Sequence, residues 1–61
     1  MNMETNIESF LAAVRKAKRA RVVRMLRGKM ETAMRKARIG YDAQDEALRE
    51  FDRNIPKGLP Y

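Results

Sequence analysis

The sequence predicts an all-α protein, an antiparallel helical hairpin in one small domain that spans residues 1–61. Apolar residues make up 44% of the chain and recur at spacings of three and four, as on one side of a helix. Signals that start and stop helices separate these stretches. A chain of this size buries only about 60% of its unfolded surface, and it has no Cys for a disulfide and no His for a metal site. We therefore expect oligomerisation or partner binding to add stability.

A long basic helix is expected over about residues 6–39. Thr5 and Glu8 form a capping box at its start. Two apolar stripes follow, the first stripe being Ile7, Phe10, Leu11, Val14 and Ala17 and the second stripe Val23, Leu26, Met30, Ala33, Met34 and Ala37. The two stripes lie on different sides of a continuous helix. Two alternatives follow. The helix is continuous or kinked and buries different sides against different partners, or it breaks at Gly28, where glycine can take the left-handed conformation that ends a helix.

A short acidic helix is expected over about residues 42–53. Lys36 and Arg38 suit the last turn of the first helix, and Gly40 is expected in the left-handed position that caps it. Asp42 begins the second helix, whose five acidic and two basic residues give a net charge of −3. Pro56 ends it, since proline disfavours helical backbone at the preceding residue. Residues 54–61 then form an extended tail, and residues 1–5 a flexible or extended end.

The short connection between these helices makes them antiparallel neighbours. The acidic helix is about 18 Å long, so it covers the second stripe and leaves the first stripe exposed. An exposed apolar patch indicates an interface, and we expect a homodimer or a place in a larger complex. The predicted interface residues are Ile7, Phe10, Leu11 and Val14. A break at Gly28 would instead let the N-terminal helix fold back into a three-helix bundle without such a patch.

Positive charge is concentrated between residues 15 and 38. Eleven of the 14 Lys and Arg lie there with one acid, Glu31, which leaves a net charge of +10. A helix that is charged only for solubility usually has Glu–Lys or Glu–Arg pairs four residues apart, and this stretch has only Glu31–Arg35. On a continuous helix the cations project in nearly all directions. The predicted site residues are Arg15, Lys16, Lys18, Arg19, Arg21, Arg24, Arg27, Lys29, Arg35, Lys36 and Arg38.

The ligand that this charge predicts is nucleic acid, RNA or DNA, bound through phosphates with little sequence preference. Arg, whose planar fork pairs with phosphate, outnumbers Lys by seven to four in the stretch. No aromatic residue is interleaved with the charges, which argues against stacking of single-strand bases. The alternative is a small accessory protein of the viral or plasmid type. It would dock on an acidic partner protein, and inhibit or recruit it, through the predicted interface residues and the basic helix.

No enzymatic activity, cofactor or metal site is predicted. Asp42, Asp45 and Glu46 form an acidic group, but carboxylates are favoured at a helix N-terminus, and no nucleophile or base accompanies them. No apolar run approaches the roughly 20 residues of a membrane span. Glu4 and Glu8 stand where a signal peptide carries Lys or Arg. We expect a cytoplasmic protein without membrane association.

Overall fold

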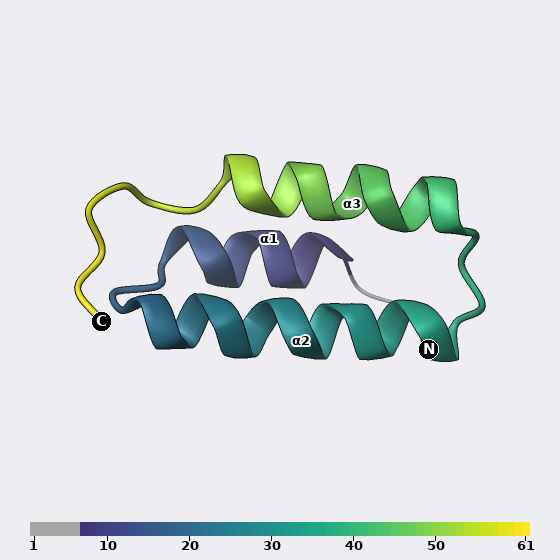
Figure 1. Cartoon of the computed structure of the whole chain (residues 1–61), viewed down its shortest axis with the longest axis horizontal. Helices are drawn as coiled ribbons and strands as arrows, with labels where there is room; N and C mark the ends of the chain where they lie inside the picture. Colours follow the sequence, from purple (N-terminus) through teal and green to yellow (C-terminus); the bar gives the residue numbers. More distant parts are fainter. Residues whose placement is uncertain (1–6) are drawn as a thin grey trace.

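The computed structural model describes residues 7–61. This part of the chain forms three helices and no strand: α1 (Ile7–Arg15), α2 (Ala20–Lys36) and α3 (Tyr41–Arg53). Figure 1 shows that α1 and α3 run in one direction and α2 in the opposite direction. The predicted all-α class is confirmed, and the predicted acidic helix is present as α3. The predicted capping box begins at Thr5, outside the described residues.

The single helix expected over residues 6–39 is wrong, because α1 and α2 are separated by a connection at residues 16–19. The expected alternative break at Gly28 is also wrong, since α2 continues through that residue. The two apolar stripes explain the break at residues 16–19. On one straight helix they would face different sides. A break between them lets both stripes face one core. Four of the five residues from Arg15 to Arg19 are also cations, and their repulsion weakens a helix at this point.

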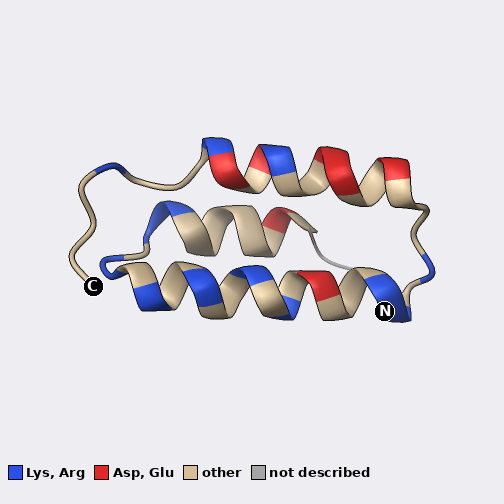
Figure 2. Cartoon of the chain, in the orientation of Figure 1, with Lys and Arg blue, Asp and Glu red and all other residues tan. Residues whose placement is uncertain are grey.

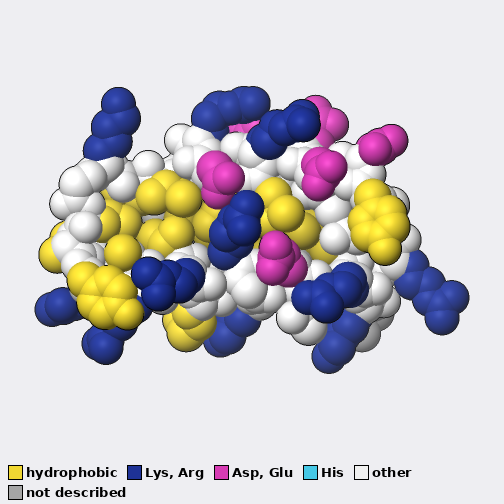
Figure 3. All heavy atoms as spheres, in the orientation of Figure 1, with side chains coloured by type: hydrophobic (Ala, Val, Ile, Leu, Met, Phe, Trp, Pro, Cys, Tyr) yellow, Lys and Arg dark blue, Asp and Glu magenta, His cyan; other side chains and the backbone are white. Residues whose placement is uncertain are grey.

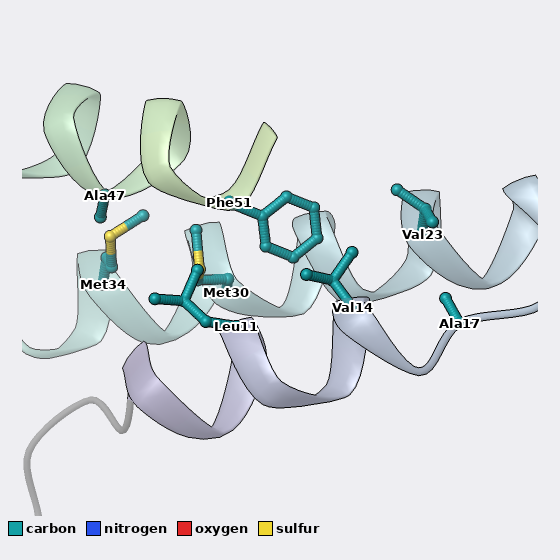
Figure 4. Close-up of a cluster of buried hydrophobic side chains, with 8 residues drawn as sticks. All are labelled: Leu11, Val14, Ala17, Val23, Met30, Met34, Ala47 and Phe51. Atoms are coloured by element: carbon teal, nitrogen blue, oxygen red, sulfur yellow. The ribbon is translucent and has the colours of Figure 1, made fainter. Parts of the chain in front are cut away.

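The core lies between the three helices. Its buried hydrophobic residues are Leu11, Val14, Ala17, Val23, Met30, Met34, Ala47 and Phe51. The ring of Phe51 is fully buried and points from α3 toward Val14 and Met30 (Figure 4). Met34 lies beside Ala47 at one end of the same cluster. Each helix therefore contributes to a single shared core.

The first stripe belongs to this core. Leu11 is 4% exposed and Val14 is 0% exposed, while Ile7 and Phe10 are partly buried and pack against the cluster. The expectation that these four residues form an exposed interface patch is therefore wrong. The expectation failed because it depended on the continuous helix, which would have carried the first stripe beyond the reach of α3.

The left-handed residue at the end of α2 is Arg38 (φ 59°) and not Gly40. The N–H of Arg38 donates to the carbonyl of Arg35 (3.0 Å), and the N–H of Ile39 donates to the carbonyl of Met34 (3.1 Å). This is the hydrogen-bond pattern of a Schellman motif. Gly40 has φ −62° and is the N-cap of α3, so the predicted position of the cap is wrong by two residues. The earlier cap brings Ile39 against the core.

The C-terminal tail returns to the end of the bundle where α1 and α2 are connected (Figure 1). Ile55 and Leu59 pack against the core. The carbonyl of Pro60 accepts a hydrogen bond from the N–H of Ala20 (2.7 Å). Because Arg19, the N-cap of α2, makes no side-chain capping bond, the tail satisfies one of the free N–H groups in the first turn of that helix.

Candidate nucleic-acid interface

One side of α2 packs on the core and the opposite side faces solvent. The core side carries Val23, Leu26, Met30 and Met34. At 100° per residue, the exposed side covers a sector of about 140°. We call this sector the outer face of α2, and its residues are Arg21, Arg24, Met25, Gly28, Lys29, Thr32, Arg35 and Lys36. Five of these eight residues are cations and none is acidic, so the outer face has a charge of +5.

Acidic and basic residues are segregated between α3 and α2. Figure 2 shows most acidic positions on α3 and a row of basic positions along α2. In Figure 3 the lower edge of the molecule, where α2 lies, shows basic side chains and no acidic ones. Within residues 7–61, no acidic side chain lies within ion-pair distance of an outer-face cation. The acidic side chains of α3 therefore form no ion pair with the cations of the outer face.

Arg27 is the one predicted site residue that the structure ties to the acidic helix. It is half-buried, with Nε 3.4 Å from Oδ1 of Asp52 and Nη1 3.7 Å from Oε2 of Glu31. Its position in α2 places it near the core side and toward α3. Arg27 therefore lies apart from the cations of the outer face.

A second group of cations lies in and beside the α1–α2 connection. These are Arg15, Lys16, Lys18 and Arg19, and all four are exposed. Nε of Arg15 donates to Oδ1 of Asn54 (2.8 Å), which ties the end of α1 to the start of the tail. The connection ends at Arg19, two residues before Arg21 at the start of the outer face. Arg38, the remaining predicted residue, is exposed just beyond the opposite end of α2.

The outer face is hollowed at Gly28. The hollow has a volume of about 560 Å³ and is lined by Arg24, Met25, Gly28, Lys29, Thr32, Ala33 and Lys36. Apart from the adjacent residues and the backbone of α2 itself, no atom of residues 7–61 lies within 4 Å of the position that a Cβ would take at Gly28. The missing side chain therefore lets a ligand approach the α2 backbone more closely there, among three cations. Gly28 and Met25 were not predicted as site residues, although their positions opposite the second stripe place them on the exposed side.

The C-terminal tail places an aromatic residue, Tyr61, beside the outer face. Cζ of Arg24 lies 5.4 Å from the centroid of the Tyr61 ring, and Tyr61 is 72% exposed. The two residues are far apart in the chain, and only the return of the tail brings them together. An aromatic ring therefore does lie among the cations, contrary to the argument from sequence order.

Comparison of the chain with known protein families, curated proteins and solved structures finds no match. In the described part of the chain, no three carboxylates are grouped in a way that would hold a metal ion. None of the helices formed by residues 7–61 combines the length and the apolar composition needed to cross a bilayer. The charge and shape of the outer face are therefore the main evidence for function.

Proposed function

We propose that this protein binds nucleic acid, RNA or DNA, through phosphate contacts made by the outer face of α2 and the adjacent α1–α2 connection. The observation that carries the proposal is the charge of +5 on a face without acidic residues. Arg21 and Arg24 stand one helical turn apart and repel each other when no anion is bound. A phosphate between them would remove that repulsion and form charge-assisted hydrogen bonds with both.

The dimensions of the outer face suit a short stretch of nucleic-acid backbone. Arg21 and Lys36 are separated by about 23 Å along the helix axis, which corresponds to about seven phosphates of one strand at roughly 3.4 Å each. α1 and α3 pack against the core side of α2, so the outer face is the side of this helix that is open to a ligand. Phosphate contacts carry little sequence information, and we therefore propose binding with low sequence preference.

The alternative of docking on an acidic protein has lost the apolar surface that motivated it. Its predicted contact residues Ile7, Phe10, Leu11 and Val14 are part of the core or pack against it. Homodimerisation through this stripe loses its basis for the same reason. The outer face does not suit self-association either, because two copies would bring charges of +5 together.

The salt dependence of binding tests the proposal. Fluorescence anisotropy of labelled duplex DNA, duplex RNA and single strands would be recorded across a salt series. The five cations of the outer face alone predict a slope of log K against log salt of about −4.5 for duplex DNA and about −3.5 for a single strand, and contacts from the α1–α2 connection make the slope steeper. Polyglutamate of matched charge serves as the competitor that represents an acidic protein, and it should displace the oligonucleotides poorly.

Two variants of equal net charge locate the site. One changes Arg21, Lys29 and Arg35 of the outer face to Gln, and the control changes Arg49, Arg53 and Lys57 on α3 and the tail to Gln. Both lower the formal net charge from +6 to +3. The first should lower the duplex slope by about 2.7, while the control retains most of it. Equal losses in the two variants, or no binding of any oligonucleotide at low salt, would refute the proposed function.

A further inference from the structure

The exposed ring of Tyr61 lies beside the outer face with a guanidinium over it. Cζ of Arg24 is 5.4 Å from the ring centroid, within the range of a cation–π contact. Arg24 also lines the hollow at Gly28. We infer that Tyr61 and Arg24 form a stacking site for an unpaired nucleobase, so that the preferred ligand of the outer face is a single strand. This inference rests on the proposed function.

The ring is held in place by its neighbours in the tail. Pro60, directly before Tyr61, accepts the hydrogen bond from the N–H of Ala20 at the start of α2 (2.7 Å). Leu59 packs against the core. These two contacts hold the backbone directly before Tyr61, and the Arg24 guanidinium lies over its ring. A base therefore meets a ring that is already positioned, which lowers the ordering cost of stacking.

The ring offers one face to a ligand. The Arg24 guanidinium covers part of the ring surface, yet 72% of Tyr61 is exposed. Stacking on an aromatic ring accepts every base, because each base has a π-face, and it requires that this face be free. Within a duplex, all bases except those of the two terminal pairs already stack on both sides. The Tyr61 site therefore distinguishes unpaired from paired nucleic acid, which phosphate contacts alone do poorly.

The neighbouring cations continue the site in both directions. Arg21 stands one turn before Arg24 on the same side of α2, and Lys29 borders the hollow on the side away from the tail. A strand with one base on Tyr61 can thus place its adjacent phosphates against cations. At Gly28 its backbone can come close to the helix, because no side chain intervenes.

Tyr41 provides a matched internal control. It is 84% exposed and lies at the start of α3, at the end of α2 opposite to the Tyr61 site. Among residues 7–61 the only cation over an aromatic ring is Arg24 over Tyr61. Because the chain has two tyrosines and no tryptophan, each tyrosine can be made the sole emitter by changing the other to Phe.

Tyrosine emission then reports stacking at each position. The Tyr41→Phe variant, which keeps Tyr61, is titrated with ten-nucleotide dU and rU strands and with a 30-base-pair DNA duplex, in which few bases have a free face. Anisotropy of labelled copies shows when each is bound. Both strands should quench Tyr61 emission and the duplex should not, and neither should quench Tyr41 in the Tyr61→Phe variant. A larger response to rU than to dU would assign the preference to RNA, and equal responses would show that the base is recognised without the 2′-OH.

Affinities complete the test. Tyr61→Ala should weaken single-strand binding by at least about fivefold, the lower end of what loss of one base stack costs. Tyr61→Phe should stay within twofold of the parent, and duplex binding should change little in either variant. Single-strand binding without quenching, or equal loss of both ligands in Tyr61→Ala, would overturn the inference and leave the proposed function intact. If no oligonucleotide binds at low salt, both fail.

Discussion

Replacing Arg38 with glycine should make this protein more stable. Arg38 adopts φ 59° at the end of α2, a conformation that costs an L-residue roughly 1–2 kcal/mol and that glycine adopts freely. Glycine also has more entropy to lose on folding, so the net gain is smaller, about 1 kcal/mol. In a domain of this size that gain raises Tm by about 4–8 °C.

The measurement is thermal and urea unfolding followed by circular dichroism at 222 nm. Arg38→Ala removes the same charge but keeps a Cβ, so it isolates the backbone term from the loss of a cation near the helix C-terminus. Asn tolerates the left-handed region better than most residues. The expected order of stability is therefore Arg38→Gly, then Arg38→Asn, then Arg38→Ala. If the glycine and alanine variants unfold at the same midpoint, the left-handed cap is not strained as argued.

Three further predictions concern the helix interior, the core and the ion pair. Gly28→Ala should raise stability by up to about 1 kcal/mol in urea unfolding, because, apart from the adjacent residues, the added Cβ meets no side chain of residues 7–61 within 4 Å. A loss of stability would show that the glycine conformation is needed. Phe51→Ala should lower the free energy of unfolding by about 3–5 kcal/mol, which is comparable with the roughly 3–9 kcal/mol expected for the whole chain. The helical dichroism of this variant at 25 °C should therefore largely disappear, and native-like dichroism would contradict the central position of the ring. A double-mutant cycle on Arg27 and Asp52, whose side chains are 41% and 53% exposed, should give a coupling below about 1 kcal/mol; a larger value would show that this pair holds α3 in place.

The sequence was sufficient to predict the helical class and which apolar residues share a side of a helix. It was not sufficient to predict where the first helix ends. Periodicity identifies which residues share a side of a helix, and α3 lies within one residue of its predicted range. The break at residues 16–19 has no glycine, proline or capping side chain to mark it. It follows from the tertiary requirement that both stripes reach one core, together with the tail carbonyl of Pro60 that caps α2.

The candidate site was predicted as a set of residues but not as a surface. Ten of the eleven predicted cations are exposed, and Arg27 is held between α2 and α3. On a continuous helix over residues 6–39 the same cations would spread around the axis. Only the burial of the second stripe fixes which side of α2 faces solvent, and only the path of the tail brings Tyr61 to Arg24.

Several features in α2 and just beyond its C-terminus lower the stability of the free protein. Arg38 holds a strained backbone conformation, Gly28 weakens the middle of an exposed helix, and Arg21 and Arg24 repel each other. All four residues lie outside the core, on or beside the outer face. A ligand that binds only the folded state adds stability according to its concentration relative to Kd. A polyanion on the outer face would relieve the repulsion directly, so we expect the protein to unfold at a higher temperature when nucleic acid is bound.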